Sequence, residues 1–417
     1  MKNVLTTPVV QGITRREGLL SLLGSALALA GCGGGGGGGV ASISSGGTGS
    51  LSDGGGAAIS SGATGSFSVG PISGFGSIIV GAIRFDDSTA SSILDDDGNT
   101  LLSNQLKLGM MVRVKGGKQK ADSSANADSI EVRSELLGPI DSISGQTLVV
   151  LGQAVQVTVT TIFEEGLTGL SALAVGDIVE AHGFVDPVSN RLTATRIERK
   201  NLANVKAFKL QGSISALDST SKTLRIGTLA ISFAALVDIP ASLTLVNGKL
   251  VRVRLATTPI AGTRTALKIR AVEVEVADRD EAEVEGTITE FTSGISFKVN
   301  GLPVTASGIT VPAGLKLGDR VKVEGSLVNG VLVAKSVKLD DENDSLKFEL
   351  HGKVDSLSTT AKTFVLRGVT VDYNGSPAFV KGTAANLING VSVEVKGVTS
   401  AGGTKVKATR ITFEKID

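Results

Sequence analysis

The 417-residue chain is poor in the side chains that most enzymes and metal proteins use: it has one Cys, two His, one Tyr and no Trp. A zinc cluster, a disulfide framework and most histidine-dependent triads need more of these residues than the chain contains. Lys and Arg number 41 against 40 Asp and Glu, so a net charge of +1 does not attract a polyanion. With only 14 aromatic residues, a stacking surface for nucleic acid is also not expected. We therefore expect no nucleic-acid partner and no cofactor.

An apolar run near the N-terminus indicates export. Leu19 to Ala30 is too short to span a bilayer as a helix, but it has the length of a signal-peptide core and follows Arg15 and Arg16. It ends in Leu-Ala-Gly-Cys32, which resembles the lipobox of bacterial lipoproteins and implies lipidation of Cys32 and cleavage before it. A plain secretory signal is the alternative. The arginine pair also resembles part of a twin-arginine motif, so general secretion and the twin-arginine route both stay open.

The segment after Cys32 has the composition of a flexible tether. Gly33 to Gly39 are seven consecutive glycines, and Ser, Gly, Ala and Thr dominate as far as Gly65. Such a segment buries too little apolar surface to fold. We expect residues 1–31 to be a lipoprotein signal peptide and residues 32–65 to be the lipidated cysteine with a disordered Gly/Ser-rich tether. The expected location is the bacterial cell envelope, with the lipid in the outer membrane.

Three short patterns recur in the same order through the rest of the chain. The first is Gly-x-Ile or Gly-x-Val, the second a Gly before an alternating strand, and the third Ala-x-x-Ile or Ala-x-x-Val. They begin, respectively, at Gly70, Gly138, Gly212, Gly286 and Gly352; at Gly109, Gly176, Gly248, Gly318 and Gly390; and at Ala127, Ala194, Ala266, Ala334 and Ala408. This regularity predicts five repeats of similar length, at 66–133, 134–203, 204–278, 279–342 and 343–417.

Each repeat has the pattern of β structure. Segments such as Val112-Arg113-Val114-Lys115 alternate strictly, which predicts valines on a core face and charges on a solvated face. Short apolar runs separated by Gly-containing turns precede them, as in hairpins. We expect an all-β chain of five small antiparallel barrels, OB-like in size and strand count, with SH3-like barrels or small sandwiches as alternatives. As in other repeat arrays, each unit would contact its neighbours in sequence.

The first repeat carries the motif on which a family resemblance depends. Gly70-Pro71-Ile72-Ser73-Gly74-Phe75-Gly76, with the later Leu106-Lys107-Leu108-Gly109-Met110, resembles the bacterial domain-of-unknown-function family 5666. The resemblance is close in repeat one, good in repeats two and four, and weaker in repeats three and five. Repeat three has Leu255 where the other repeats have Gly. The resemblance implies a lipoprotein with a Gly-rich tether and implies no activity or catalytic residue.

Few residues qualify as site candidates. Asp95, Asp97 and Asn99 alternate as at the start of a calcium loop, but the twelfth position is Leu106 instead of Glu, and Asp97-Gly98 is also a common hairpin turn. We therefore expect a turn and no metal site. His182 and His351 lie in different repeats and would share a site only if two barrels met. The acidic runs 278–285 and 340–344 lie at repeat junctions, where we expect solvated linkers.

These observations favour a non-enzymatic, lipid-anchored envelope protein whose repeats form an elongated binding or spacer module. The alternative is an accessory lipoprotein that binds a small molecule, glycan or peptide on one barrel face. The expected partners are the membrane and an envelope protein or glycan. An enzyme is the hypothesis with the least support, because the sequence has no nucleophile elbow, metal cluster or phosphate-binding loop.

Overall fold

The computed structural model describes residues 64–235, 239–260, 262–340, 347–400 and 403–414. The predicted signal peptide, Cys32 and nearly all of the predicted tether lie outside these residues. Among the helices in the described part of the chain, none has the length and apolar character needed to cross a membrane.

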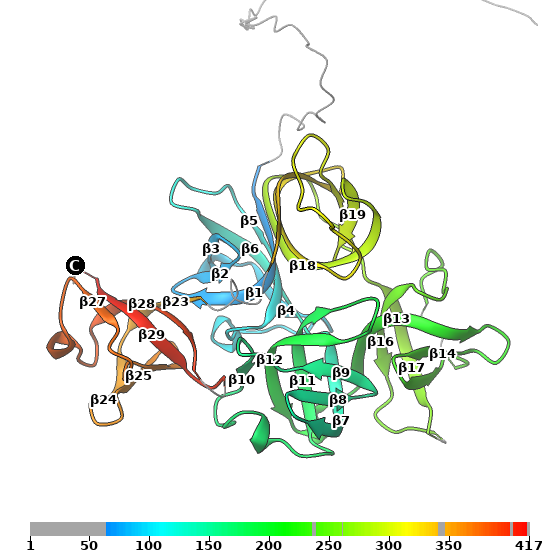
Figure 1. Ribbon diagram of the computed structural model, residues 1–417, viewed down its shortest axis with the longest axis horizontal. Helices are drawn as coiled ribbons and strands as arrows, with labels where there is room; N and C mark the ends of the chain where they lie inside the picture. Colours follow the sequence, from blue (N-terminus) through cyan, green and yellow to red (C-terminus); the bar gives the residue numbers. More distant parts are fainter. Residues whose placement is uncertain (1–63, 236–238, 261, 341–346, 401–402, 415–417) are drawn as a thin grey trace, which may run out of the picture. The chain divides into compact units, whose positions relative to one another are not determined.

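The first three repeats form barrels 1 to 3 (Figure 1). Barrel 1 contains β1 (Ser66–Phe75), β2 (Ile78–Val80), β3 (Ile83–Asp86), β4 (Ser92–Asp95), β5 (Met111–Gly116) and β6 (Ser124–Arg133). Barrel 2 contains β7 (Leu136–Ser144), β8 (Thr147–Val150), β9 (Gln153–Gln156), β10 (Ile162–Phe163), β11 (Ile178–Val185) and β12 (Leu192–Lys200). Barrel 3 contains β13 (Phe208–Asp218), β14 (Thr223–Ile226), β15 (Leu229–Ser232), β16 (Leu250–Leu255) and β17 (Arg264–Ala271).

The last two repeats form barrels 4 and 5. Barrel 4 contains β18 (Arg279–Ser293), β19 (Ser296–Val299), β20 (Leu302–Thr305), β21 (Arg320–Val328) and β22 (Val331–Leu339), and Figure 1 shows it as a ring of strands. Barrel 5 contains β23 (Phe348–Lys353), β24 (Asp355–Ser358), β25 (Thr363–Leu366), β26 (Val369–Asp372), β27 (Ala378–Val380), β28 (Ser392–Thr399) and β29 (Val406–Phe413). The described helices are single 3-10 turns, η1 (Asp87–Thr89), η2 (Ser103–Gln105), η3 (Leu170–Ala172), η4 (Leu202–Asn204) and η6 (Ala384–Asn386).

All five barrels close in the same strand order. In barrel 1, β1 pairs with β2, β2 with β3, β3 with β6, β6 with β5, and β5 again with β1. Of these closing pairs the β3–β6 pair is parallel, and β4 adds a second parallel pair with β6. The parallel pairs corresponding to β3–β6 are β9–β12, β15–β17, β20–β22 and β26–β29. A five-stranded barrel closed in this order is OB-like. The predicted fold class, an all-β chain of small OB-like barrels, is confirmed.

The alternating segments form the fourth strand of each barrel, which pairs with the first and the fifth. In barrel 1, Val112 and Val114 are buried in the core, whereas Arg113 and Lys115 lie on the outer face. The pairing with the fifth strand contains a β-bulge in every barrel, at the Gly that the repeats share or at Leu255 in barrel 3. A Cβ on Gly325 would lie 2.1 Å from the carbonyl oxygen of Val333, so the bulge brings two backbones too close for a side chain.

Strand pairing also joins barrels that are not neighbours in sequence. β1 pairs in parallel with β18 of barrel 4 and with β23 of barrel 5. The sequence neighbours barrels 2 and 3 are also joined, by the pairing of β7 with β13. Contacts between barrels are therefore not confined to neighbours in the sequence. The physical reason is that β1 presents unpaired backbone groups beyond its own barrel, and strands from any barrel can satisfy them.

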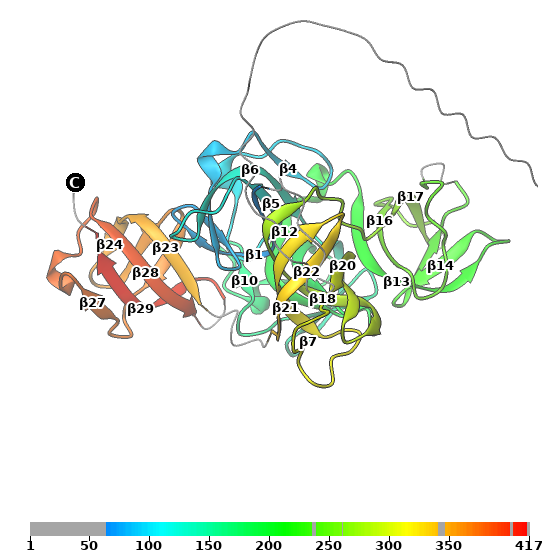
Figure 2. The same cartoon turned by 90° about the horizontal axis from the view of Figure 1, so that it is seen from above.

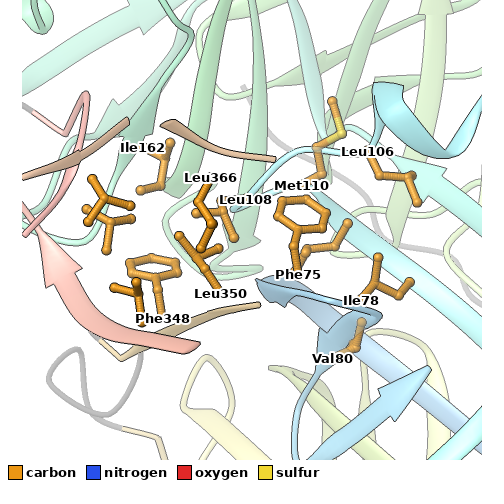
Figure 3. Packing of buried hydrophobic residues seen from close by; sticks show 14 of the residues in the cluster. Phe75, Ile78, Val80, Leu106, Leu108, Met110, Ile162, Phe348, Leu350 and Leu366 are labelled. Atoms are coloured by element: carbon orange, nitrogen blue, oxygen red, sulfur yellow. The ribbon is translucent and has the colours of Figure 1, made fainter. Parts of the chain in front are cut away.

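The hydrophobic core is shared between barrels as well. One cluster of buried residues joins barrels 1 and 5, a second joins barrels 2 and 3, and a third lies in barrel 4 with Phe67 of β1. Figure 3 shows the first cluster, where Phe75 and Leu108 lie close to Leu350 and Leu366, with Ile162 of barrel 2 at its edge. Domains of about seventy residues bury little apolar surface alone, so the shared clusters add to the stability of each barrel. Figure 2 shows β28 and β29, the strands of barrel 5 that cover part of this cluster, side by side.

Candidate functional site

Barrels 1, 2 and 3 meet at a group of charged side chains, most of them buried or half-buried, which we call the charged junction. Its members are Asp96 and Asp97 of barrel 1, Glu135, Glu180 and Lys200 of barrel 2, and Lys209, Arg252 and Arg254 of barrel 3. The aspartates follow β4, and the cations lie on β13 and β16, where Lys209 pairs with Arg254 in the strand register. Two adjacent strands thus place like charges side by side, and a carboxylate from another barrel is needed between them.

Asp96 supplies that carboxylate. Lys209 Nζ lies 2.7 Å from Asp96 Oδ1, and Arg254 Nη2 lies 3.1 Å from Oδ2. The Asp96 side chain is only 5% exposed. Burial raises the pKa of Asp96, but Lys209 and Arg254 lower it more, so the pKa lies below the usual value. The carboxyl group is therefore ionised and holds the cations of barrel 3 against barrel 1.

The barrel 2 side of the junction contains a second group of paired charges. Lys200 Nζ lies 2.9 Å from a carboxylate oxygen of Glu180 and 2.5 Å from one of Glu198. Arg196 makes a further ion pair with Glu198. Burial raises the pKa of Glu198, but Arg196 and Lys200 lower it to about 2 overall. These carboxylates are ionised at neutral pH and fully used by protein cations.

Glu135 behaves differently from the other carboxyl groups of the junction. It accepts a hydrogen bond of 3.0 Å from the Gly183 N–H, and its Oε1 lies 3.4 Å from Arg252 Nη2. Burial raises the pKa of Glu135 to about 7, because these two contacts offset only part of the lost hydration. Glu135 therefore exchanges a proton near neutral pH.

A polar cleft of about 820 Å³ opens beside the junction. Its wall comes from barrels 1, 2, 3 and 5, and includes the floor of the junction at Asp96, Glu180 and Lys209. The other polar side chains that line it are Asp95, Asn104, Gln105, Lys107, Ser134, Glu164, Glu165, His182, Arg196, Glu198, Lys200, Thr370, Thr404 and Lys405. Apolar residues, among them Leu108, Met110, Ile162 and Phe163, complete the wall. Its volume lies within the range of ligand sites, although its lining is more polar than most.

His182 is the buried polar group of this wall without a full set of partners. Its side chain lies on β11, and Nδ1 is 2.6 Å from the carbonyl oxygen of Arg133, to which it donates. Among the described residues, Nε2 has no hydrogen-bond partner. Burial lowers the pKa of His182, so the ring is neutral and Nε2 carries a free lone pair.

The Asp95 to Asn99 segment forms a turn. The Asp95 carboxylate accepts hydrogen bonds from the N–H groups of Asp97 and Asn99, at 2.9 and 2.8 Å, and from the Asn99 side-chain amide. Gly98 takes the positive φ that such a turn needs, +83°. Asp97 points away from this ring of contacts and pairs with Arg254 at 2.7 Å. Asp95 and Asn99 thus bind each other within the turn, whereas Asp97 binds Arg254 of barrel 3.

His351 lies in a different network, on β23 of barrel 5. Its Nε2 is 2.8 Å from Glu349, and its Nδ1 is 2.9 Å from Glu414. Arg84 of barrel 1 reaches the same Glu349 carboxylate at 2.5 Å. The hydrogen bond from His351, followed by contacts with Lys396, lowers the pKa of Glu349 to about 2, although partial burial opposes the change. The structure therefore does not bring His182 and His351 into one site.

Glu349, His351 and Glu394 form a group whose ligand atoms lie within 4.8 Å of one another. This spacing is compatible with a divalent cation in geometric terms. However, Lys396 lies 2.9 Å from Glu349 and 3.2 Å from Glu394, and both imidazole nitrogens face carboxylates. An ion would have to displace these contacts, so we describe the group as an ion-pair network between barrels 1 and 5.

His351 predicts a pH dependence of stability. Its hydrogen bond to Glu349 raises its pKa in the folded state, with a smaller contribution from Glu414, despite partial burial. A raised His pKa stabilises the fold below the unfolded value of about 6.5 and loses this effect as the pH rises through the folded value. Thermal midpoints of the protein and of His351→Gln, measured across that window, should therefore converge with rising pH.

Other groups also titrate in this pH range. Comparing the protein with His351→Gln separates their effect on stability from that of His351. Burial raises the pKa of Glu135 to about 7 and of Glu285 to about 8, which lowers stability with rising pH in both proteins. Only the difference between the two midpoints reports His351. A constant difference across the window would contradict the assignment.

The sequence predicts that the acidic run 278–285 is a solvated linker, and this prediction is wrong. β18 begins at Arg279; in it Glu283 is buried and Glu285 is half-buried. Glu283 pairs with Lys322 and accepts a 2.7 Å hydrogen bond from the Ala82 N–H of barrel 1. The reason is the parallel pairing of β18 with β1, which covers these carboxylates. Of the second run, Asp340 is buried beside Arg320, and 341–344 lie outside the described residues.

The model of DUF5666, a domain of unknown function, matches residues 138–198, 285–338 and 351–412. Three of the five barrels, 2, 4 and 5, are thus similar to this family. The resemblance seen in the sequence is thereby confirmed for barrels 2, 4 and 5.

The three DUF5666 matches each run from the first-strand Gly or its neighbour to the fifth strand of a barrel. The matched regions do not include barrel 1, which carries the motif that resembles the family most closely, or barrel 3, which has Leu255 at the bulge. Among curated proteins there is no match. A solved structure described as drosophila Unr CSD456 matches 50% of this chain and 97% of its own length, at 15% identity and a TM-score of 0.13.

Of the candidate residues named from the sequence, the structure places Asp95 and His182 in the wall of the cleft and Asp97 in the charged junction. The sequence reasoning misses the other residues of the junction. Asp96, Lys209 and Arg254 occupy positions that strand alternation assigns to a solvated face. The available signal was charge complementarity, since an Asp triplet in repeat one has a counterpart in the Arg pair of β16 in repeat three. Nothing in the local pattern tells which barrels meet.

Proposed function

We propose that this protein is a lipid-anchored component of the bacterial envelope and that its barrels act as a non-enzymatic binding module. The observation that carries the proposal is the polar cleft, because a spacer needs no concave site to which several repeats contribute. The paired charges in its wall support binding over catalysis. Their titratable groups are held by ion pairs, which leaves them poorly placed to transfer protons to a substrate.

The chemistry of the wall favours a polar ligand with hydroxyl or amide donors, such as a glycan or a peptide. Gln105, Asn104 and Thr404 offer neutral hydrogen-bonding groups along the wall. Acidic and basic side chains both contribute, so the cleft does not select strongly for either charge.

The anchor predicts a result at the membrane. Cys32→Ala removes the thiol that the lipobox-like sequence offers for lipidation, while the tether and barrels are unchanged. Two or more acyl chains hold a protein stably at a bilayer, because each buried CH₂ contributes about 0.8 kcal/mol. Fractionation of cells should therefore find the variant in the soluble envelope fraction and the unchanged protein with the membranes. Equal membrane retention of both would contradict the lipid anchor.

The binding proposal is tested by site-specific photocrosslinking in cells. A photoreactive amino acid at Gln105, an exposed residue of the cleft wall, is expected to capture an envelope glycan or peptide. Lys335 on β22 serves as the matched control, because it is 58% exposed and lies outside the cleft. Adducts at Gln105 that are absent at Lys335 support a binding cleft. The same adducts at both positions, or none at Gln105, would contradict it.

A further inference from the structure

Barrel 1 docks on barrel 2 through a loop that recurs in every repeat. The loop precedes the fourth strand and consists of Leu106-Lys107-Leu108-Gly109 in barrel 1. Its last two carbonyl oxygens accept hydrogen bonds from β12: Thr195 Oγ1 donates to Gly109 O at 2.7 Å, and Arg196 Nη1 donates to Leu108 O at 3.2 Å. Leu108 is 2% exposed in this contact.

The receiving sequence occurs a second time in the chain. Ala-Thr-Arg-Ile stands at 194–197 on β12 and again at 408–411 on β29. The backbone surroundings are equivalent, because β10 pairs with β12 at Arg196 and Ile197, as β27 pairs with β29 at Arg410 and Ile411. The bulge glycine also pairs with the Ala in both barrels.

The second receiving site is not covered. Thr195 and Arg196 are 9% and 6% exposed, whereas Thr409 and Arg410 are both exposed. Within the described part of the chain, the Arg410 side chain makes no hydrogen bond or ion pair, whereas the Thr409 hydroxyl donates to the Lys396 carbonyl at 3.0 Å. Barrel 5 therefore presents the arginine donor of this site without an acceptor, and the threonine hydroxyl would have to exchange its acceptor on docking.

A loop of the docking type is also uncovered, in barrel 2. Leu173-Ala174-Val175-Gly176 corresponds to the barrel 1 loop, with Gly176 at φ +91° and Gly109 at φ +78°. Each Gly N–H bonds the first strand at 2.9 Å, so the two loops have the same conformation. Val175, the counterpart of the buried Leu108, is 65% exposed. No described group donates to the carbonyl oxygens of Val175 and Gly176.

We propose that the Val175 loop of one molecule docks on the Thr409–Arg410 surface of a second copy of this chain. The contact repeats the internal docking of barrel 1 on barrel 2, with Val175 in the place of Leu108 and Arg410 in the place of Arg196. The two surfaces differ, so the association is head-to-tail and builds rings or chains.

A second copy is the occupant because the same molecule uses other contacts between these barrels. Barrel 2 meets barrel 5 through a 2.9 Å hydrogen bond from the Phe163 N–H to the Gly403 carbonyl, and Thr399 bonds the Val159 carbonyl. In that arrangement both the Val175 loop and the Thr409–Arg410 surface stay exposed.

Cysteine crosslinking of the full chain tests the proposal. Cys32 is the only native cysteine, so a Cys32→Ala background gives chains with one engineered thiol each. Val175→Cys and Thr409→Cys chains are mixed and treated with a short bismaleimide. Severalfold more dimer should form in this mixture than with Lys335→Cys in place of Thr409→Cys, since Lys335 is exposed at the equivalent position of barrel 4.

Two further variants define the result. Adding Arg410→Glu to the Thr409→Cys chain removes the main donor from an exposed position and should reduce the dimer to the control level. Dimer formation equal to the Lys335→Cys control would overturn the proposal. A chain with both Val175→Cys and Thr409→Cys that crosslinks only within itself would overturn the second copy as the occupant.

Discussion

Replacement of Asp96 by Ala is expected to lower the free energy of unfolding by about 3–5 kcal/mol, the usual cost of removing one partner from a buried ion pair. The variant leaves Lys209, Arg252 and Arg254 next to one another without the carboxylate that all three face. These cations are 9–15% exposed, so water cannot replace the lost partner. Urea unfolding followed by circular dichroism measures the change.

Asp97→Ala is the matched control for Asp96→Ala. Asp97 is the next residue and also pairs with Arg254, but its side chain is 42% exposed. A solvent-exposed pair contributes about 0–1 kcal/mol, so this variant should unfold close to the unchanged protein. If both variants lost the same small stability, the buried junction would not exist as described.

Gly325→Val in barrel 4 is expected to destabilise the fold by about 3 kcal/mol or more, at the upper end of overpacking effects. A Cβ at this position would lie 2.1 Å from the Val333 carbonyl oxygen and 3.0 Å from the Ala334 Cα. Because these are backbone atoms of the paired strand, no rotamer change relieves the clash. Gly117→Val is the control, since a Cβ there would meet no atom within 4 Å.

Barrel 3 shows that a larger residue can occupy the position equivalent to Gly325. It carries Leu255 at the equivalent bulge, and that side chain is fully buried in the core. If Gly325→Val matched the stability of Gly117→Val, barrel 4 would have to adopt the barrel 3 conformation. The glycine would then be a preference of the repeat instead of a requirement.

The barrels themselves could be predicted from the sequence because their signals are local. Alternation around Val112 and Val114 and the regular spacing of Gly109 and Ala127 depend on residues within one repeat. The parallel pair that closes each barrel, such as β3 with β6, follows from closure and has no signature of its own in the sequence.

The assembly of the barrels could not be predicted in this way. Contacts such as β1 with β23 join residues more than 270 positions apart, and no periodicity marks them. For the same reason the charged junction could not be predicted from the sequence. Lys209 has the pattern of a solvated strand residue, and it is buried only because Asp96 of barrel 1 packs against it. The outer face of a barrel becomes buried only when another barrel packs on it. The charged residues on such a face can be understood only together with the opposing face that carries their partners.

The contact between Asp96 and Lys209 joins barrels 1 and 3 at the centre of the charged junction. A double-mutant cycle of Asp96→Ala and Lys209→Ala, measured by urea unfolding, tests it most directly. We predict a coupling energy above about 1 kcal/mol, against about 0.5 kcal/mol or less for the exposed Glu324–Lys338 pair within barrel 4. Additive effects of the two substitutions would show that barrels 1 and 3 do not meet, and would contradict the charged junction and the cleft beside it.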